Sequence, residues 1–186
     1  REVTDFLKEY DITENTLFMG AFAIALSCFV GSDTCGFVTV NNGRHDTRLS
    51  QSIGMFVKTL PMCVNIRRDM TVKEFLCELQ NDFFKTMEHD CISFGELVSR
   101  YKVSPEIMFV YQSEMLNCIE EIKVNDTLAK ITAMMFKEQN GYRLNLSFSG
   151  NEYSENYMVS FGECVMTVIK SLMSAKQLNE VVLLPA

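Results

Sequence analysis

Residues 42–65 read NGRHDTRLSQSIGMFVKTLPMCVN; they follow one run that favours a β-strand and contain most of a second. Residues 35–40 before them are rich in β-branched and aromatic side chains, and Asn41-Asn42-Gly43 is a turn signal, which predicts a strand leading into a loop. Residues 44–52 are polar, and a second strand is expected at residues 59–66. Because Pro61 has no backbone N–H, this second strand must begin late or lie at a sheet edge.

Two helices flank this segment. The first is predicted at Glu14–Val30, with Thr13 capping its first turn and Gly31 ending it in a left-handed conformation. Its apolar residues surround the helix almost completely, so we expect a central helix that is buried on both sides. The second opens at Thr71-Val72-Lys73-Glu74, a capping-box pattern, and runs to about Glu88. Its apolar residues share one face, as in a helix that covers a sheet: Val72, Phe75, Leu76, Leu79, Phe83 and Met87.

The rest of the chain continues the alternation of helices and strands. A short helix is predicted at Phe94–Tyr101, a buried strand at residues 107–111, and irregular structure at residues 117–130. Residues 131–136 and 142–148 flank a turn at Gln139-Asn140-Gly141 and predict a hairpin, whose second strand alternates between apolar and polar positions. Ser154 caps a last helix that runs to about Lys176, and residues 181–184 predict a final short strand.

These elements predict the fold class. Helices that are apolar on one face, placed between strands, indicate an α/β two-layer sandwich in which helices pack on a mixed β-sheet. The length of 186 residues is that of one domain. Because the chain begins with Arg1 and ends with the apolar run 183–186, we expect it to be a fragment of a longer protein.

Composition narrows the possible partners. The net charge of −7 has the wrong sign for a surface that neutralises a phosphate backbone, which disfavours nucleic acid. No apolar stretch reaches the roughly 18 residues that a membrane helix needs, which disfavours a membrane. The seven cysteines contain no CxxC pair and favour reduced, mostly buried thiols in a cytoplasmic protein: Cys28, Cys35, Cys63, Cys77, Cys91, Cys118 and Cys164.

Few residues suggest chemistry of their own. His45 and His89 have no metal-ligand spacing to a cysteine or to each other, so we interpret both as solvated loop residues and expect no metal site. Cys91 and His89 could also form a nucleophilic pair. Their closeness in sequence is weak evidence for this, because the cysteine and histidine of such enzymes are brought together by the fold. The sequence has no GxxxxGK, GxGxxG or GxSxG motif. The methionines Met108, Met115, Met134 and Met135 are read as core residues.

Residues 42–65 resemble the condensation domain of nonribosomal peptide synthetases. The second half of that domain carries a Gly-Arg after a strand and then IGxFVNTLPxR, and this chain has Gly43-Arg44 and then IGMFVKTLP at 53–61. His89 with Phe94 is similar to the HQDxPF motif, and Ser104-Pro105 before a strand is similar to RNPLF. The resemblance covers nearly all of residues 1–186. The family's HHxxxDG motif does not occur in them, so the chain resembles the C-terminal, chloramphenicol-acetyltransferase-like subdomain without the N-terminal one.

The resemblance implies a role in forming peptide bonds between aminoacyl and peptidyl thioesters. In the family these are carried by the phosphopantetheine arms of carrier proteins, which enter a tunnel between the two subdomains. The implied partners are the N-terminal half of the domain, peptidyl or acyl carrier proteins and the synthetase's adenylation domain; no catalytic residue and no directly bound cofactor is implied for this half. Gly54, Phe56, Val57, Lys58 and Thr59 would shape or support the tunnel wall, and Gly43 with Arg44 would brace the strand end. A purely structural role for these residues is the alternative.

The chain also departs from the family pattern. Lys58 replaces the family's Asn, and Cys63 replaces its Arg. Residues 90–93 replace its QDxP. These changes add a cation near the tunnel and remove an ion-pairing group. They favour a divergent member, or a non-catalytic docking or scaffolding module that binds a carrier protein. An epimerisation, cyclisation or acyltransferase relative of the same fold is another alternative, whereas a free-standing trimeric acetyltransferase is disfavoured because neither histidine lies in HxxxD. We also expect an exposed apolar flank, rich in Met and Phe, where the missing subdomain packs.

Overall fold

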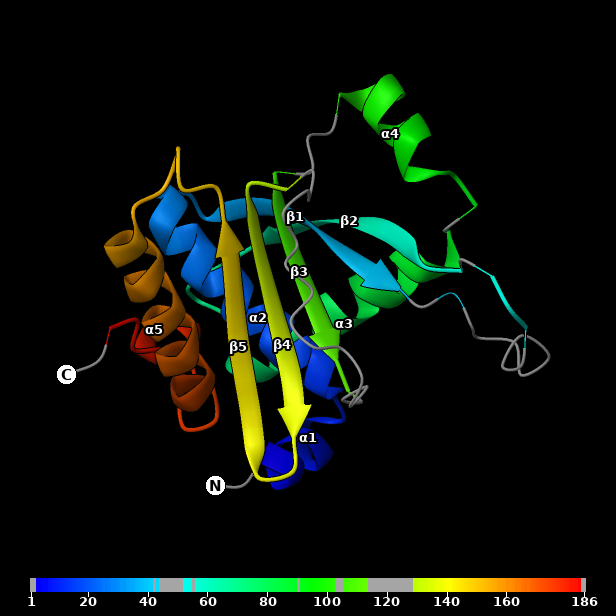
Figure 1. The fold of residues 1–186 in the computed structure, drawn as a ribbon. Coiled ribbons are helices and arrows are strands. Elements are labelled where there is room, and N and C mark those ends of the chain that lie inside the picture. Colours follow the sequence, from blue (N-terminus) through cyan, green and yellow to red (C-terminus); the bar gives the residue numbers. More distant parts are fainter. Residues whose placement is uncertain are drawn as a thin grey trace.

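The computed structural model describes residues 3–41, 43, 52–54, 56–89, 91–102, 106–113 and 129–184. Figure 1 shows a β-sheet with helices packed on one face. The elements, in chain order, are α1 (Val3–Tyr10), α2 (Glu14–Val30), β1 (Thr34–Asn41), β2 (Lys58–Asn65), α3 (Val72–Glu88), α4 (Phe94–Tyr101), β3 (Ile107–Gln112), β4 (Ile131–Glu138), β5 (Gly141–Phe148), α5 (Glu155–Leu172) and a 3₁₀ helix, Leu178–Glu180.

The sheet is mixed, and its strand order is β2-β1-β3-β4-β5. Strands β1, β3 and β4 run parallel, whereas β2 and β5 are antiparallel to their neighbours. The two-layer α/β sandwich and the hairpin of β4 and β5 are therefore confirmed. Strand β2 lies at the edge, as predicted from Pro61, which faces Val38 of β1 in the ladder.

Helix α2 is the centre of the core. Every residue from Thr16 to Ser27 is buried, because α2 packs against both the sheet and the neighbouring helices α3 and α5. Its ends are as predicted: the Thr13 side chain accepts a hydrogen bond from the amide of Thr16, and Gly31 has a φ of +69°. Gly20 lets α3 approach closely, since a Cβ there would lie 2.7 Å from Cδ2 of Leu76.

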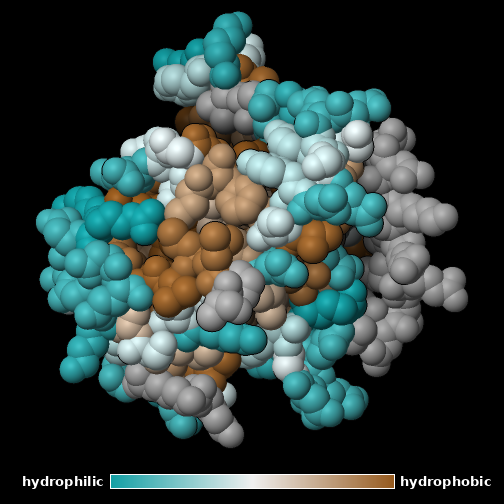
Figure 2. Space-filling view, turned by 90° about the vertical axis from the view of Figure 1, so that its left-hand side faces the viewer, coloured by the Kyte–Doolittle hydropathy of each residue, from teal (hydrophilic) through white to brown (hydrophobic). Residues whose placement is uncertain are grey.

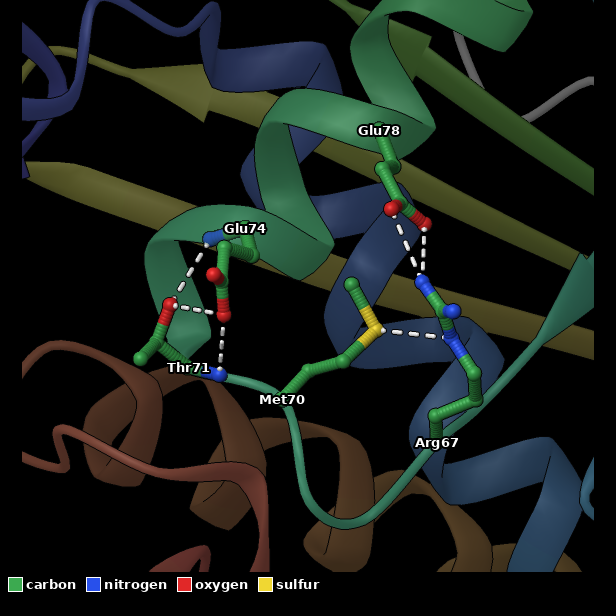
Figure 3. Close-up of polar contacts among 5 residues, drawn as sticks. All are labelled: Arg67, Met70, Thr71, Glu74 and Glu78. Carbon is green, nitrogen blue, oxygen red and sulfur yellow. Dashed lines mark hydrogen bonds and ion pairs between the residues drawn. The ribbon is translucent and has the colours of Figure 1, made fainter.

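The predicted capping box at the start of α3 is present (Figure 3). The Thr71 hydroxyl accepts from the amide of Glu74 at 3.1 Å, and the Glu74 carboxylate accepts from the amide of Thr71 at 2.9 Å. In the preceding turn, one guanidinium nitrogen of Arg67 donates to both carboxylate oxygens of Glu78, at 2.8 and 2.9 Å. These contacts fix the angle at which β2 leads into α3.

Two predicted elements differ at the C-terminal end. Helix α5 ends at Leu172 and not near Lys176, because the Ser171 carbonyl accepts from the amides of Ser174 and Ala175 and tightens the last turn. Residues 181–184 form no strand. Just before them, the carboxylate of Glu180 accepts from the amides of Lys176 and Gln177, and residues Leu178–Glu180 form the 3₁₀ helix.

Helix α1 was not predicted. Its apolar residues Val3, Phe6, Leu7 and Tyr10 share one face at helical spacing and pack on the core, so the sequence carried a signal that was overlooked in a segment of only eight residues. Among the residues described, no single helix is long and apolar enough to cross a membrane; α1 and α2 pass such a test only as a pair, bent by 96°.

The exposed apolar residues are not those that we expected. Among the described residues, the large exposed side chains include one Phe, Phe84, and no Met, so a flank rich in Met and Phe is not found there. Met135 is buried as predicted, whereas Met108 and Met134 are half-buried. Figure 2 shows apolar side chains gathered on the side where α5 lies, and on that helix Val159 is 53% exposed.

Candidate functional site

The candidate site lies where β1 ends and β2 begins. Gly43 has a φ of +65°, and a Cβ at this position would lie 2.0 Å from the carbonyl oxygen of Phe56. Its amide donates to the Asn41 side chain at 3.3 Å. Only glycine can combine this left-handed backbone with so close an approach. Gly43, two residues after β1, therefore packs directly against Phe56, two residues before β2.

The described residues between Gly54 and Thr59 differ in their exposure to solvent. A Cβ on Gly54 would lie 3.2 Å from the ring of Phe56, so the ring packs over this glycine. Phe56 and Thr59 are half-buried, Lys58 is exposed, and Val57 is 54% exposed. In the ladder Lys58 faces Asn41 and Thr59 faces Val40, so Lys58 and Thr59 lie on opposite faces of the sheet.

The other sequence motifs are only partly described. Arg44, His45 and Ser104-Pro105 lie outside the described residues. His89 is the C-cap of α3 and is exposed, and Phe94 begins α4. The thiol of Cys91 donates to the main-chain carbonyl of His89 at 3.8 Å. The contact is with the main chain of His89 and does not involve its imidazole, so it gives no support to a nucleophilic Cys91–His89 pair.

Six free cysteines are described, and they are less buried than predicted. Cys35 and Cys164 are buried, Cys28 and Cys77 are half-buried, and Cys63 and Cys91 are exposed. Burial raises the pKa of the Cys35 thiol to about 12 and that of Cys164 to about 11, so both are protonated and unreactive at neutral pH. Within the described parts of the chain, no group of three or more His, Cys, Asp or Glu residues could hold a metal ion.

Two hollows follow β2. The first, of about 300 Å³, lies beside the exposed Cys63 and is bordered by Arg67 and Glu78. The second, of about 370 Å³, lies beside the predicted site residue Thr59, between β2, the end of α3 and α4. Sequence reasoning did not find either hollow, because both arise from the packing of α3 and α4 along the edge strand.

A polar cluster around Glu14 was also missed. The Glu14 carboxylate, at the first turn of α2, accepts from Tyr142 at 2.6 Å, from Lys137 at 2.8 Å, and from the Tyr111 hydroxyl. Burial raises the pKa of Glu14, but the hydrogen bonds from Lys137 and the two tyrosines outweigh it and lower the pKa below the usual value. Burial, followed by the contact with Glu14, raises the pKa of both tyrosines. The cluster ties α2 to the ends of β3 and β4 and to the start of β5.

Comparison with known proteins places this geometry in a family. The family model described as the condensation domain matches residues 1–185. The chain belongs to the condensation domain family. Among curated relatives, Bacitracin synthase 2 of Bacillus licheniformis is 31% identical over 111 residues, which cover 58% of this chain. Bacitracin synthase 1 of the same organism is 22% identical over 187 residues, which cover 91% of this chain. The matched region is 4% of each synthase.

Solved condensation domains have the same fold. The first condensation domain of the CDA synthetase matches 98% of this chain with a TM-score of 0.77 and 12% identity. The four-domain nonribosomal peptide synthetase holo-AB3403 matches 98% with a TM-score of 0.84 and 18% identity. The chain covers 45% of the CDA condensation-domain chain and 16% of the holo-AB3403 chain. It therefore corresponds to a half-domain of a condensation domain.

Proposed function

We propose that this chain is the C-terminal half of a condensation domain whose parent protein joins carrier-tethered aminoacyl and peptidyl thioesters in the cytoplasm. The match of the family model to residues 1–185 carries the proposal. The half-length match to the CDA condensation domain supports it, as does the lack of an HHxxxDG motif in the sequence. The catalytic histidine then comes from the other half, and this half contributes one wall of the tunnel.

In peptide-bond formation, the main task of this half is to position the two substrates. The amine of one substrate attacks the thioester carbonyl of the other, the C–S bond breaks, and the carrier's phosphopantetheine leaves as a thiol. Holding both reactants in one tunnel raises their effective concentration and supplies much of the rate. Both arms belong to carrier proteins, so the chain needs no cofactor bound to itself.

The packing of Gly43 on Phe56 suits this positioning role. It fixes the start of β2, and with it Val57, Lys58 and Thr59, relative to the end of β1. Val57 and Lys58 are the exposed members of this group, and they are the side chains that a substrate or the other half of the domain can reach. Gly43, Gly54 and Phe56 act as support behind them.

The proposal predicts that the chain is silent alone. Product formation is measured with acyl-loaded and aminoacyl-loaded carrier proteins, first with the 186-residue chain and then with the chain joined to a half-domain that carries HHxxxDG. We expect product only from the joined protein, and loss of that product when the second histidine of HHxxxDG is replaced by alanine. A comparable rate from the isolated chain would refute the assignment of the catalytic histidine to the other half.

A docking or scaffolding module is the second candidate, favoured by Lys58 and Cys63 at the positions where the family has Asn and Arg. The same joined protein separates the two functions. Carrier binding is measured by NMR titration. Binding without any turnover supports scaffolding. Turnover that improves in a Lys58→Asn variant supports a divergent enzyme. The version of HHxxxDG in the parent's other half separates condensation from epimerisation or cyclisation.

A further inference from the structure

The hollow beside Thr59 has an apolar floor and a polar rim. The edge strand β2 contributes Leu60 and Pro61, and the α4 side contributes Ile92 and Leu97, so the floor is apolar. The end of α3 contributes Lys85 and His89 at the rim. The described lining includes no carboxylate, and the Asp82 carboxylate reaches Lys85 from outside the hollow at 3.6 Å.

Helix α4 is an unusual wall. Phe94, Leu97, Val98 and Tyr101 follow the spacing of an apolar helix face, yet none of the eight residues of α4 is buried. Tyr101 is 61% exposed. Figure 1 shows α4 standing apart from the helices that cover the sheet, and its main contact is with β2. Of this apolar face, Leu97 lines the hollow, and the described side chains bury none of its residues.

The size of this space limits what it can hold. A volume of 370 Å³, at roughly 30 Å³ for each water-sized group, accommodates about ten heavy atoms. Such a pocket, with an apolar floor and a few polar groups at one end, is the usual form of a small-molecule site. The Lys85 ammonium and an imidazole N–H of His89 can donate to a negative or neutral acceptor group, and the positive charge of Lys85 disfavours a cation.

We propose that this hollow binds a small amphiphile, an aliphatic chain of about eight carbons with a carboxylate head. The chain lies on Leu60, Pro61 and Leu97, and the head lies near Lys85 and His89. The inference does not depend on condensation chemistry, because binding is measured on the 186-residue chain itself without carrier proteins.

Calorimetry with hexanoate, octanoate and octylammonium tests the proposal. Burying a methylene contributes enough for about fourfold in affinity, so octanoate is expected to bind about 15-fold more tightly than hexanoate. Octylammonium, of the same length and opposite charge, is expected to bind several-fold more weakly than octanoate. Amide NMR shifts caused by octanoate are expected at Thr59, His89 and Leu97. Equal binding of octanoate and octylammonium, or shifts confined to another surface, overturns the proposal.

A matched pair of variants tests the location. Leu97→Asp places a charge on the floor of the hollow, in a helix that buries no residue, and is expected to weaken octanoate binding at least tenfold. Val159→Asp makes the same kind of change at an exposed position on α5 and is expected to leave binding unchanged. Circular dichroism establishes that both variants fold. Octanoate binding that survives Leu97→Asp in a folded protein, or that Val159→Asp weakens equally, also overturns the proposal.

Discussion

At the scale of single residues, Gly43 is the position where the candidate site depends most on the absence of a side chain. Gly43→Ala adds a Cβ that meets the Phe56 carbonyl oxygen at 2.0 Å and places alanine at a φ of +65°. The left-handed backbone alone costs alanine about 1 to 2 kcal/mol, and the contact forces β1 and β2 apart at their ends. We expect the free energy of unfolding, measured by urea denaturation, to fall by at least about 2 kcal/mol.

Gly95→Ala is the matched control for this substitution. Gly95 lies in α4, has no heavy atom within 4 Å of its ideal Cβ, and has an ordinary helical backbone. Alanine is the better helix former, so the control is expected to be neutral or slightly stabilising. If Gly43→Ala is as stable as Gly95→Ala, the close packing of Gly43 on Phe56 does not hold in solution.

At the scale of elements, Glu14 fastens the first turn of α2 to β3, β4 and β5. Because the folded-state pKa of Glu14 is lowered, its carboxylate stabilises the fold above the ordinary glutamate pKa, about 4.3, and this contribution is lost as the pH falls through the folded value. We expect Glu14→Gln to reduce the free energy of unfolding at pH 7 by about 1 to 3 kcal/mol. The difference from the unmodified chain should shrink below pH 4.

Glu155→Gln provides the comparison for Glu14→Gln. Glu155 is likewise the first residue of its helix, behind a Ser154 cap, but it is exposed and lies in α5. An exposed charge in a first helical turn is worth a few tenths of a kcal/mol. Urea denaturation across pH 3 to 7 should therefore separate the two variants. Equal losses at pH 7 would mean that helix-dipole effects, and not the tyrosine and lysine contacts, account for the role of Glu14.

The elements that the sequence predicted well are those with local signals. Thr13 and Gly31 bound α2, and Thr71 with Glu74 opens α3, because caps act within a few residues of the chain. Helix α1 carries an apolar face but has no Ser, Thr, Asp or Asn directly before it to mark its start. The path of the chain after α5 depends on contacts with distant residues, such as the hydrogen bond from the Leu178 amide to the Met70 carbonyl. Pro61 pointed to an edge strand because a residue without a backbone N–H cannot donate a hydrogen bond to a neighbouring strand.

The candidate site was predictable to a smaller extent. The motif that includes Gly43 and Thr59 selected the segment that we take as the site, and the structure brings Gly43 against Phe56, whereas the functional role of these residues stays a prediction. The hollow beside Thr59 and the cluster around Glu14 join residues that are far apart in the chain. Glu14 and Tyr142, for example, are 128 positions apart and meet through α2 packing on the sheet. Only the tertiary fold brings such groups together.

At the scale of the whole molecule, stability is distributed unevenly around α2. The Phe22 ring contacts Phe37 of β1, Phe109 of β3 and Phe161 of α5, so one side chain links three other elements of the core. Helix α4 is at the other extreme, since none of its residues is buried. Local opening requires the loss of few buried contacts in α4 and of most of the core in α2.

Native-state hydrogen exchange, followed by NMR in increasing urea, measures this gradient. We expect the α2 amides from Phe18 to Leu26 to exchange only through global unfolding, and the α4 amides to exchange through a local opening that urea barely affects. Helix α5 is the internal comparison: Ser93 caps α4 and Ser154 caps α5 in the same way, with side chains that accept from the third residue on. Because the caps match, stronger protection in α5 reports its buried face, whereas equal protection of α4 and α5 would contradict an α4 that is held only weakly against β2.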